Sequence, residues 1–303
     1  MAAFLWCTAA IVAFTALATF AKALINSGLP AFEVVFFRNL FATLIFSPLL
    51  LTRGRELVTT RRYGLYGWRC FVMVGSMLLW FSALALIPMA ELTAISYVAP
   101  LFGTLFAALF LGERLRIRRM TALVVGFIGA MIILRPAGSA LGLGQLLALL
   151  AAICSAVAAI LIKQLTSGSD DPAKIVFLTH LITVPVSLGP ALFVWRWPVL
   201  DMLPMMIGLG VAATLGHLCL TRAYASADAS LVMTFEFTKL PVAAFIGYIV
   251  FGELIDGWTW VGATIVFLSA FYVTRREAQL RRQAMNEALE EDWTGASRLM
   301  VKR

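Results

Sequence analysis

Charged side chains are scarce in this sequence. Asp, Glu, Lys and Arg make up 13% of its 303 residues, about half of the roughly 25% found in soluble domains. Hydrophobic residues reach 61%, and the mean hydropathy is +0.92. A water-soluble protein of this length could not bury so much apolar surface, whereas a bilayer is itself a solvent for it. The lipid bilayer is therefore the first partner that the composition predicts.

Residues that build catalytic and metal sites are also scarce. The sequence has four cysteines and two histidines, and the cysteines stand singly, so neither a zinc site nor a disulfide framework is indicated. It has no phosphate-binding loop, no HExxH motif and no GxSxG turn, which excludes direct use of ATP and argues against an intramembrane enzyme. We therefore expect no catalytic residue, no metal and no cofactor. The cysteines are Cys7, Cys70, Cys154 and Cys219.

Apolar runs long enough to cross a bilayer occur ten times in the chain, since a span needs about 20 residues, with a range of about 17–25. The fifth run is the weakest, although Arg119 and Arg135 at its ends could reach the two interfaces. Residues 1–21 carry no charged side chain, which favours a membrane span over a cleavable signal peptide. The runs are 3–23, 32–51, 66–87, 91–111, 119–135, 143–163, 174–195, 203–223, 230–251 and 257–274.

The basic residues predict how these helices are oriented. The formal net charge is +8, but Lys and Arg lie in short loops between apolar runs, which indicates cytoplasmic loops and no nucleic-acid binding. The basic segments are 53–69, 114–119 and the tail from 275 onward. Ten helices place all of them on one side together with both termini. We expect a multi-pass protein of a bacterial-type cytoplasmic (inner) membrane, with both termini in the cytoplasm.

The two halves of the chain are similar to each other at an offset of about 140 residues. Leu111–Glu113 matches Phe251–Glu253, and Phe127 matches Phe267. Each half holds five predicted helices, and an odd number makes the second half enter the membrane upside down. Inverted repeats are typical of secondary transporters, whose binding site lies near the midplane between the halves. The predicted all-α units are a first repeat over 1–138, a second repeat over 139–275 and a cytoplasmic tail over 276–303.

Small residues four positions apart recur in several runs and let helix backbones approach closely. We expect tight helix contacts at these stripes. They are Gly103 with Ala107, Ala243 with Gly247, and Gly208 with Ala212 and Gly216.

Several short motifs are spread over the two halves. They are Phe36–Leu40, Ala83-Leu84, Ala90-Glu91, Pro100, Leu111–Glu113, Ala223–Ala229, Pro241 and Phe251–Glu253. These motifs resemble those of the EamA-type branch of the drug/metabolite transporter superfamily, over about residues 3–274. The resemblance implies a ten-helix, two-repeat transporter whose cavity walls come mainly from the third, fourth, eighth and ninth helices. Members are similar to amino-acid and metabolite exporters, and also to riboflavin and S-adenosylmethionine importers.

Two charges lie near the middle of the ninth run, Glu236 and Lys239. An ionisable residue there costs about 2.5–3.5 kcal/mol on insertion scales, so it is expected to face protein or a cavity. Three residues apart, the two side chains can meet on one helix face. They could hold a proton or ammonium group and a carboxylate of a substrate, or form an internal ion pair that locks the helix.

Other polar residues inside the runs have two interpretations each. His217 and His180 could titrate near neutral pH and couple transport to protons, or be hydrogen-bonded core residues. Arg38 could bind a carboxylate or donate to carbonyl groups of a neighbouring helix. The aromatic side chains of Trp80, Tyr97 and Tyr224 could line a cavity or serve ordinary packing.

Residues at the helix ends are expected to have structural roles. Lys22 and Lys163 occupy corresponding ends of the first and sixth runs and are predicted to be interfacial anchors. Glu113 and Glu253 end the fourth and ninth runs and are also assigned to structure. The segment Trp195–Trp197 is predicted to be part of an aromatic interface belt.

These observations favour a secondary transporter that works by alternating access. An opposed Glu and Lys near aromatic side chains suits a zwitterion with an apolar side chain, so the leading prediction is an exporter of aromatic or other apolar amino acids, with protons as a possible coupling ion. Uptake of riboflavin or S-adenosylmethionine is the alternative within the same class. A non-transporting membrane subunit is the alternative from another class. The sequence sets no oligomeric state.

Overall fold

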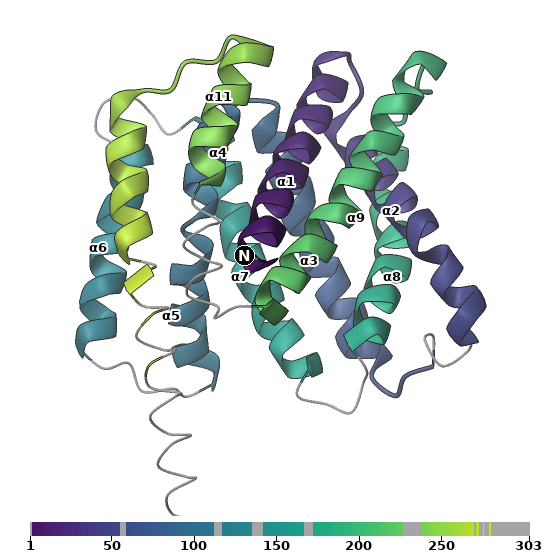
Figure 1. Cartoon of the computed structure of the whole chain (residues 1–303), viewed down its shortest axis with the longest axis horizontal. Helices are drawn as coiled ribbons and strands as arrows, with labels where there is room; N and C mark the ends of the chain where they lie inside the picture. The colour runs from purple at the N-terminus through teal and green to yellow at the C-terminus, as the bar shows by residue number, and fades with distance from the viewer. Residues whose placement is uncertain are drawn as a thin grey trace, which may run out of the picture.

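A computed structural model of the chain describes residues 2–54, 59–111, 117–134, 142–166, 172–226 and 238–269, together with 271, 272, 275 and 279. Over these residues the chain consists of helices joined by short turns, and no strand occurs among them (Figure 1). The helices are α1 (Ala2–Asn26), α2 (Ala31–Arg53), α3 (Tyr63–Leu84), α4 (Met89–Ser96), α5 (Ala99–Leu111), α6 (Ile117–Leu134), α7 (Leu143–Thr166), α8 (Pro172–Phe193), α9 (Leu203–Ser226) and α11 (Lys239–Phe251). A 3₁₀ turn, η2 (Leu200–Met202), precedes α9, and a last helix spans Gly257–Ser269.

Most predicted runs correspond to one helix each. The ends of α1, α2, α3, α6, α7, α8 and α9 lie within three residues of the predicted ends, and the weak fifth run is confirmed as α6. The ninth run is described from Thr238 onward and contains α11, while its residues 230–237 lie outside the described residues. The tenth run contains the last helix. The fold is therefore an all-α membrane protein, as predicted.

The single helix predicted over 91–111 is wrong, because two helices occupy this run. Tyr97 and Val98 separate α4 from α5, and their amide nitrogens lie 3.2 and 3.0 Å from carbonyl oxygens three residues back. Pro100 accounts for the break, since proline has no N–H and its ring clashes with the carbonyl group four residues earlier, that of Ser96. Discontinuous helices recur at the binding sites of transporters.

Helices of the two halves pack in reciprocal pairs. The first helix of the first half, α1, lies along the third helix of the second half, α9, and they are neighbours in Figure 1. The first helix of the second half, α7, lies along the third helix of the first half, α3. In the same way α2 packs against α8 and α4 against α11. The main hydrophobic core draws its residues from both halves, so it lies where the halves meet.

The stripe of glycines predicted in α9 forms a close contact with α1. A Cβ atom on Gly208 would lie 3.1 Å from the ring of Phe20, and one on Gly216 would lie 2.9 Å from the ring of Phe14. Gly210 approaches α2 equally closely. Side chains larger than hydrogen would push these helices apart, so the prediction of a tight contact at this stripe is confirmed.

A second close contact joins α6 of the first half to the last helix of the second half. A Cβ atom on Gly262 would lie 2.7 Å from the carbonyl oxygen of Gly129, and one on Gly129 would lie 2.9 Å from the backbone nitrogen of Val266. The two helices therefore meet backbone to backbone, without a layer of side chains between them.

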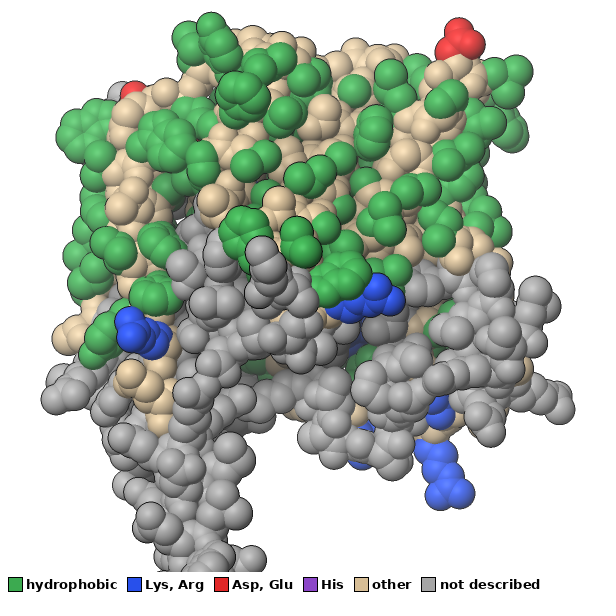
Figure 2. All heavy atoms as spheres, in the orientation of Figure 1, with side chains coloured by type: hydrophobic (Ala, Val, Ile, Leu, Met, Phe, Trp, Pro, Cys, Tyr) green, Lys and Arg blue, Asp and Glu red, His purple; other side chains and the backbone are tan. Residues whose placement is uncertain are grey.

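The outer surface is apolar, as a bilayer requires. Figure 2 shows hydrophobic side chains over most of the described face, with the Lys and Arg drawn there near its lower edge and the acidic side chains at its upper edge. By length and composition, the helical segments Phe4–Asn26, Tyr63–Leu84, Leu143–Leu161 and Leu200–Leu220 can cross a membrane, and shorter apolar helices accompany them. The chain is a multi-pass membrane protein.

Candidate functional site

A line of polar side chains crosses the interior between α2, α8 and α9, and Arg38 lies at its centre. The Arg38 side chain is 4% exposed. Its Nη1 atom donates to Asn39 Oδ1 at 2.8 Å and lies 3.3 Å from the sulfur of Met77. Its Nη2 atom lies 3.2 Å from Nε2 of His217. The hydrogen-bond partners of Arg38 are therefore neutral or weakly basic groups.

Among the described residues, no carboxylate group lies within ion-pair distance of Arg38. A buried guanidinium group is unfavourable unless an anion or several oriented acceptors compensate its charge. Five N–H groups in a planar fork can hold a carboxylate or a row of carbonyl oxygens. The binding of a solute carboxylate by Arg38 stays a prediction.

The two histidines predicted as site residues lie on either side of the boundary between helices α8 and α9. The rings of His180 and His217 have centroids 6.5 Å apart. The backbone carbonyl of His180 accepts a hydrogen bond from Thr43 of α2 at 3.2 Å, and Asn39 Nδ2 donates to Ser187 of α8 at 3.3 Å. The structure therefore brings Arg38 of the first half together with His180 and His217 of the second half.

Lys239 extends this line toward α1. Its Nζ atom lies 5.0 Å from the centre of the Phe14 ring, and the same ring meets His217 edge-on with centroids 5.2 Å apart. Phe14 therefore connects the two predicted site residues by aromatic contacts. Glu236, the predicted partner of Lys239, lies outside the described residues, so that pairing stays a prediction.

Arg69 is a polar residue of this interior that sequence reasoning assigned to a loop. It is 9% exposed, and its Nη1 atom donates to the hydroxyl group of Thr179 in α8. Cys70 beside it lies 3.6 Å from the carbonyl oxygen of Thr179. The signal in the sequence is that Arg69 lies inside the apolar run predicted over 66–87. In the structure it is the seventh residue of α3.

The predicted aromatic residues have different positions. Trp80 of α3 is partly buried and donates from Nε1 to the hydroxyl group of Ser96 at 3.2 Å, directly beside the break between α4 and α5. Tyr97, within that break, packs against the main core. The side chain of Tyr224 lies outside the described residues. Trp80 and Tyr97 therefore mark one wall of the interior, at the discontinuous helix.

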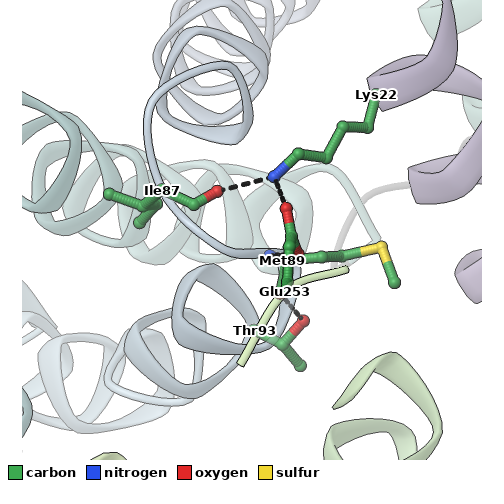
Figure 3. Close-up of polar contacts among 5 residues, drawn as sticks. All are labelled: Lys22, Ile87, Met89, Thr93 and Glu253. Carbon is green, nitrogen blue, oxygen red and sulfur yellow. Dashed lines mark hydrogen bonds and ion pairs between the residues drawn. The ribbon is translucent and has the colours of Figure 1, made fainter. Parts of the chain in front are cut away.

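A second buried polar centre lies at the C-terminal end of α1, and Figure 3 shows its geometry. Lys22 Nζ forms an ion pair with Glu253 Oε1 and donates to the carbonyl oxygen of Ile87 at 2.9 Å. Glu253 Oε2 accepts from the backbone N–H of Met89 at 2.8 Å. We call these four residues the clamp.

The clamp corrects the interpretation of Lys22 as an interfacial anchor. Its side chain is 8% exposed and points toward the Glu253 carboxylate inside the protein. Phe251 adds an aromatic ring 5.8 Å from the ammonium nitrogen. Glu253 follows the end of α11 by two residues, and its contacts fit the structural role assigned to it. The side chains of Lys163 and Glu113 lie outside the described residues.

An open groove of about 720 Å³ lies at the same end of the molecule. Trp195 and Arg196 line it together with the turn after α1. The Arg196 backbone N–H donates to Glu33 Oε1 at 2.6 Å, which joins α8 to α2, while the side chain of Trp197 is 85% exposed. Exposed Trp197 suits the predicted aromatic belt, whereas Trp195 packs against Phe36 and Phe37. The midplane cavity expected from the sequence stays a prediction.

A bundle of membrane helices whose halves pack together, with charged and hydrogen-bonding side chains buried where they meet, is typical of a solute transporter. The chain belongs to the EamA-like transporter family, whose model matches residues 1–135 and again residues 142–275. The double match repeats the internal similarity of the two halves.

Curated relatives cover nearly the whole chain. It is 35% identical to a riboflavin transporter of Vibrio cholerae over 288 residues, which are 94% of this chain and 96% of the relative. It is 31% identical to a riboflavin transporter of Rhizobium johnstonii, with 92% and 93% covered. An S-adenosylmethionine uptake transporter of Rickettsia bellii is 28% identical over 84% of this chain and 87% of its own length. A crystal structure of another protein shares the fold, with a TM-score of 0.60 at 21% identity, covering 90% of this chain and 98% of that one.

Proposed function

We propose that this transporter carries riboflavin into the cell. The observation that supports this most is the 35% identity to the Vibrio cholerae riboflavin transporter over 94% of the chain. A second riboflavin transporter is also more than 30% identical. The relatives from Rickettsia bellii, named for S-adenosylmethionine uptake, support the inward direction.

The chemistry of the interior suits a riboflavin-like solute. The isoalloxazine ring is planar and apolar on its faces, and its pyrimidine edge carries carbonyl oxygens and an N–H group. Arg38 and His217, held 3.2 Å apart, offer donors for such an edge. Trp80, beside the broken helix, offers an aromatic face for stacking. We assign Arg38 and His217 to the polar edge and Trp80 to the ring.

Other predicted residues extend the assignment. His180 and Lys239 lie at the two ends of the same polar line, where the hydroxyl groups of the ribityl chain need donors and acceptors. Tyr97 belongs to the wall at the helix break. Glu236 and Tyr224 stay predicted members of the site. No proton needs to be bound for this arrangement to hold a neutral solute, and proton coupling stays a prediction.

Export of a zwitterionic amino acid is the second candidate. It is favoured by one observation, that Arg38 is buried without a carboxylate partner among the described residues, because a substrate carboxylate would supply one. A pseudopaline exporter of Pseudomonas aeruginosa is 29% identical over 82% of this chain, so export also occurs among the relatives. The names of these relatives do not point to amino acids.

Growth complementation tests the first proposal. A riboflavin-auxotrophic bacterium without its own riboflavin uptake should grow at low external riboflavin when it expresses this chain, and not when it carries an empty vector. Asp201→Asn is a matched control, since this carboxylate is exposed in η2, remote from the polar line, and should support normal growth.

Counterflow in proteoliposomes separates the two candidates. Vesicles loaded with unlabelled riboflavin should accumulate labelled riboflavin, whereas vesicles loaded with phenylalanine or leucine should not accumulate the same labelled amino acid. Counterflow of amino acids without counterflow of riboflavin would replace the first candidate by the second. Folded protein that exchanges neither would contradict both.

A further inference from the structure

The clamp joins the two halves of the transporter at one membrane face. Lys22, Ile87 and Met89 belong to the first half, and Glu253 belongs to the second half. Lys22 lies in the last turns of α1, Ile87 and Met89 follow α3, and Glu253 follows α11. The C-terminal ends of α1 and α11 lie in the upper part of Figure 1. The distribution of basic loops assigns this face to the extracytoplasmic side. We propose that the clamp is the extracytoplasmic gate, closed in this structure and opened in each transport cycle.

The carboxylate of Glu253 is bound at both oxygens. Oε1 faces the Lys22 ammonium group, and Oε2 receives the Met89 N–H at 2.8 Å. Met89 is the first residue of α4, so its amide is one that no residue of the helix can accept from. A carboxylate has one oxygen for the Lys22 ammonium group and one for the Met89 N–H. A glutamine at position 253 has a single acceptor oxygen, so its N–H₂ group would face Lys22 when that oxygen accepts from Met89. The clamp therefore requires a carboxylate at this position.

Backbone geometry holds the carboxylate in place. Gly252 ends α11 with a φ of +67°, the left-handed conformation that suits glycine, which turns the chain back over the helix. Oε2 of Glu253 lies only 3.0 Å from where a Cβ atom on Gly247 would be. Gly247, predicted as part of a helix contact, thus also leaves the space that the Glu253 carboxylate occupies.

The position of the clamp makes it suited to opening. The side chains of Lys22 and Glu253 are 8% and 14% exposed, so both lie close beneath the protein surface. A buried ion pair contributes little net stability compared with apolar packing. When the halves separate at this face, water can solvate both charges, which offsets the lost attraction. Such a contact can alternate between two states, whereas the same pair in the middle of the membrane could not.

The inference rests on the transporter class and not on the proposed substrate, so it is tested without a substrate. Spin labels at Ser27, exposed after α1, and Leu254, exposed after Glu253, report the distance across the face by double electron–electron resonance. The labels are placed in a variant whose native cysteines are replaced by serine or alanine. Wild-type clamp residues should give mainly one short distance, and Glu253→Gln should increase the population of longer distances at least threefold.

Matched variants make the test decisive. Asp201→Asn removes an exposed carboxylate at the same face and should leave the distance distribution unchanged. The exchange Lys22→Glu with Glu253→Lys keeps the attraction but cannot accept from Met89 or donate to Ile87, so it should close the face only in part. If Glu253→Gln prevents folding, Lys22→Gln, which removes the other charge of the pair, takes its place. A folded Glu253→Gln or Lys22→Gln protein with the wild-type distances would overturn the gate.

Discussion

Two buried cations in this molecule are compensated differently. Lys22 has a carboxylate partner, a backbone carbonyl and an aromatic ring around its ammonium group. Arg38 has an asparagine oxygen, a methionine sulfur and a histidine nitrogen, with no carboxylate among the described residues. Both side chains are at most 8% exposed.

The difference indicates what each cation does. A cation that pairs with a carboxylate of the protein needs no ligand to balance its charge. Such a pair can hold two helices of the chain together. A charge that lacks one keeps capacity for acceptor atoms of a solute, at a cost to the stability of the empty protein. This difference is consistent with the proposed roles of Lys22 in the gate and of Arg38 in solute binding. Substitutions that change one partner of Lys22 or Arg38 at a time test this difference.

Removing the uncompensated cation should have the largest effect. Hydrogen bonds to a charged group contribute about 1.5–3 kcal/mol each, so Arg38→Leu is expected to lower the initial uptake rate about 10- to 100-fold in proteoliposomes. Arg38→Lys keeps the charge without the planar fork and should recover part of the rate. If thermal stability falls as steeply as transport in both variants, Arg38 is a structural residue instead.

Giving Arg38 a partner of its own should also impair transport. Asn39 Oδ1 already lies 2.8 Å from Nη1, so Asn39→Asp places a carboxylate at hydrogen-bond distance and makes Arg38 resemble Lys22. We expect an uptake rate about tenfold lower, with an unchanged or higher unfolding temperature in detergent. Unchanged uptake would show that Arg38 does not meet the solute.

Replacing the ion pair of the clamp by apolar side chains should keep the extracytoplasmic face closed but make it harder to open. In Lys22→Met with Glu253→Leu, packing takes the place of the ion pair, and such exchanges are neutral or stabilising by about 1–4 kcal/mol elsewhere. We expect an equal or higher unfolding temperature but a several-fold lower transport rate, because water no longer stabilises the open face. Wild-type transport in this variant would argue against an alternating ion pair.

The smallest effect is expected from Gly247→Ala. Its Cβ atom would lie 3.0 Å from Glu253 Oε2, so the carboxylate must shift by a few tenths of an ångström. A two- to threefold change in uptake rate is expected. Gly75→Ala is the control, because a Cβ atom there meets nothing within 4 Å and alanine favours the helix by about 1 kcal/mol. Equal effects of both substitutions would separate Gly247 from the clamp.

The hydrophobic runs were sufficient to predict the helices, because a bilayer demands about 20 apolar residues per span. The break after Ser96 was missed, although Pro100 carried the signal. Runs of apolar residues do not show a change of backbone hydrogen bonding inside a span. The apolar run over 91–111 therefore predicts one membrane span that contains α4 and α5. It does not show that this span consists of two helices.

Site residues were predictable only where a charge or histidine interrupts a run. Arg38, His180 and His217 were found in this way and lie together. Lys22 and Glu253 were singled out as residues at helix ends, but their pairing joins positions 231 apart, and no local pattern shows which ends of different helices meet. Only the three-dimensional packing of the halves reveals it.

The contact between Gly129 and Gly262 has a mechanical consequence. The backbones of the two helices meet there with no layer of side chains between them, which only small residues allow. Because α6 and the last helix come from different halves, any side chain larger than hydrogen at either glycine would hold the two halves apart at this place.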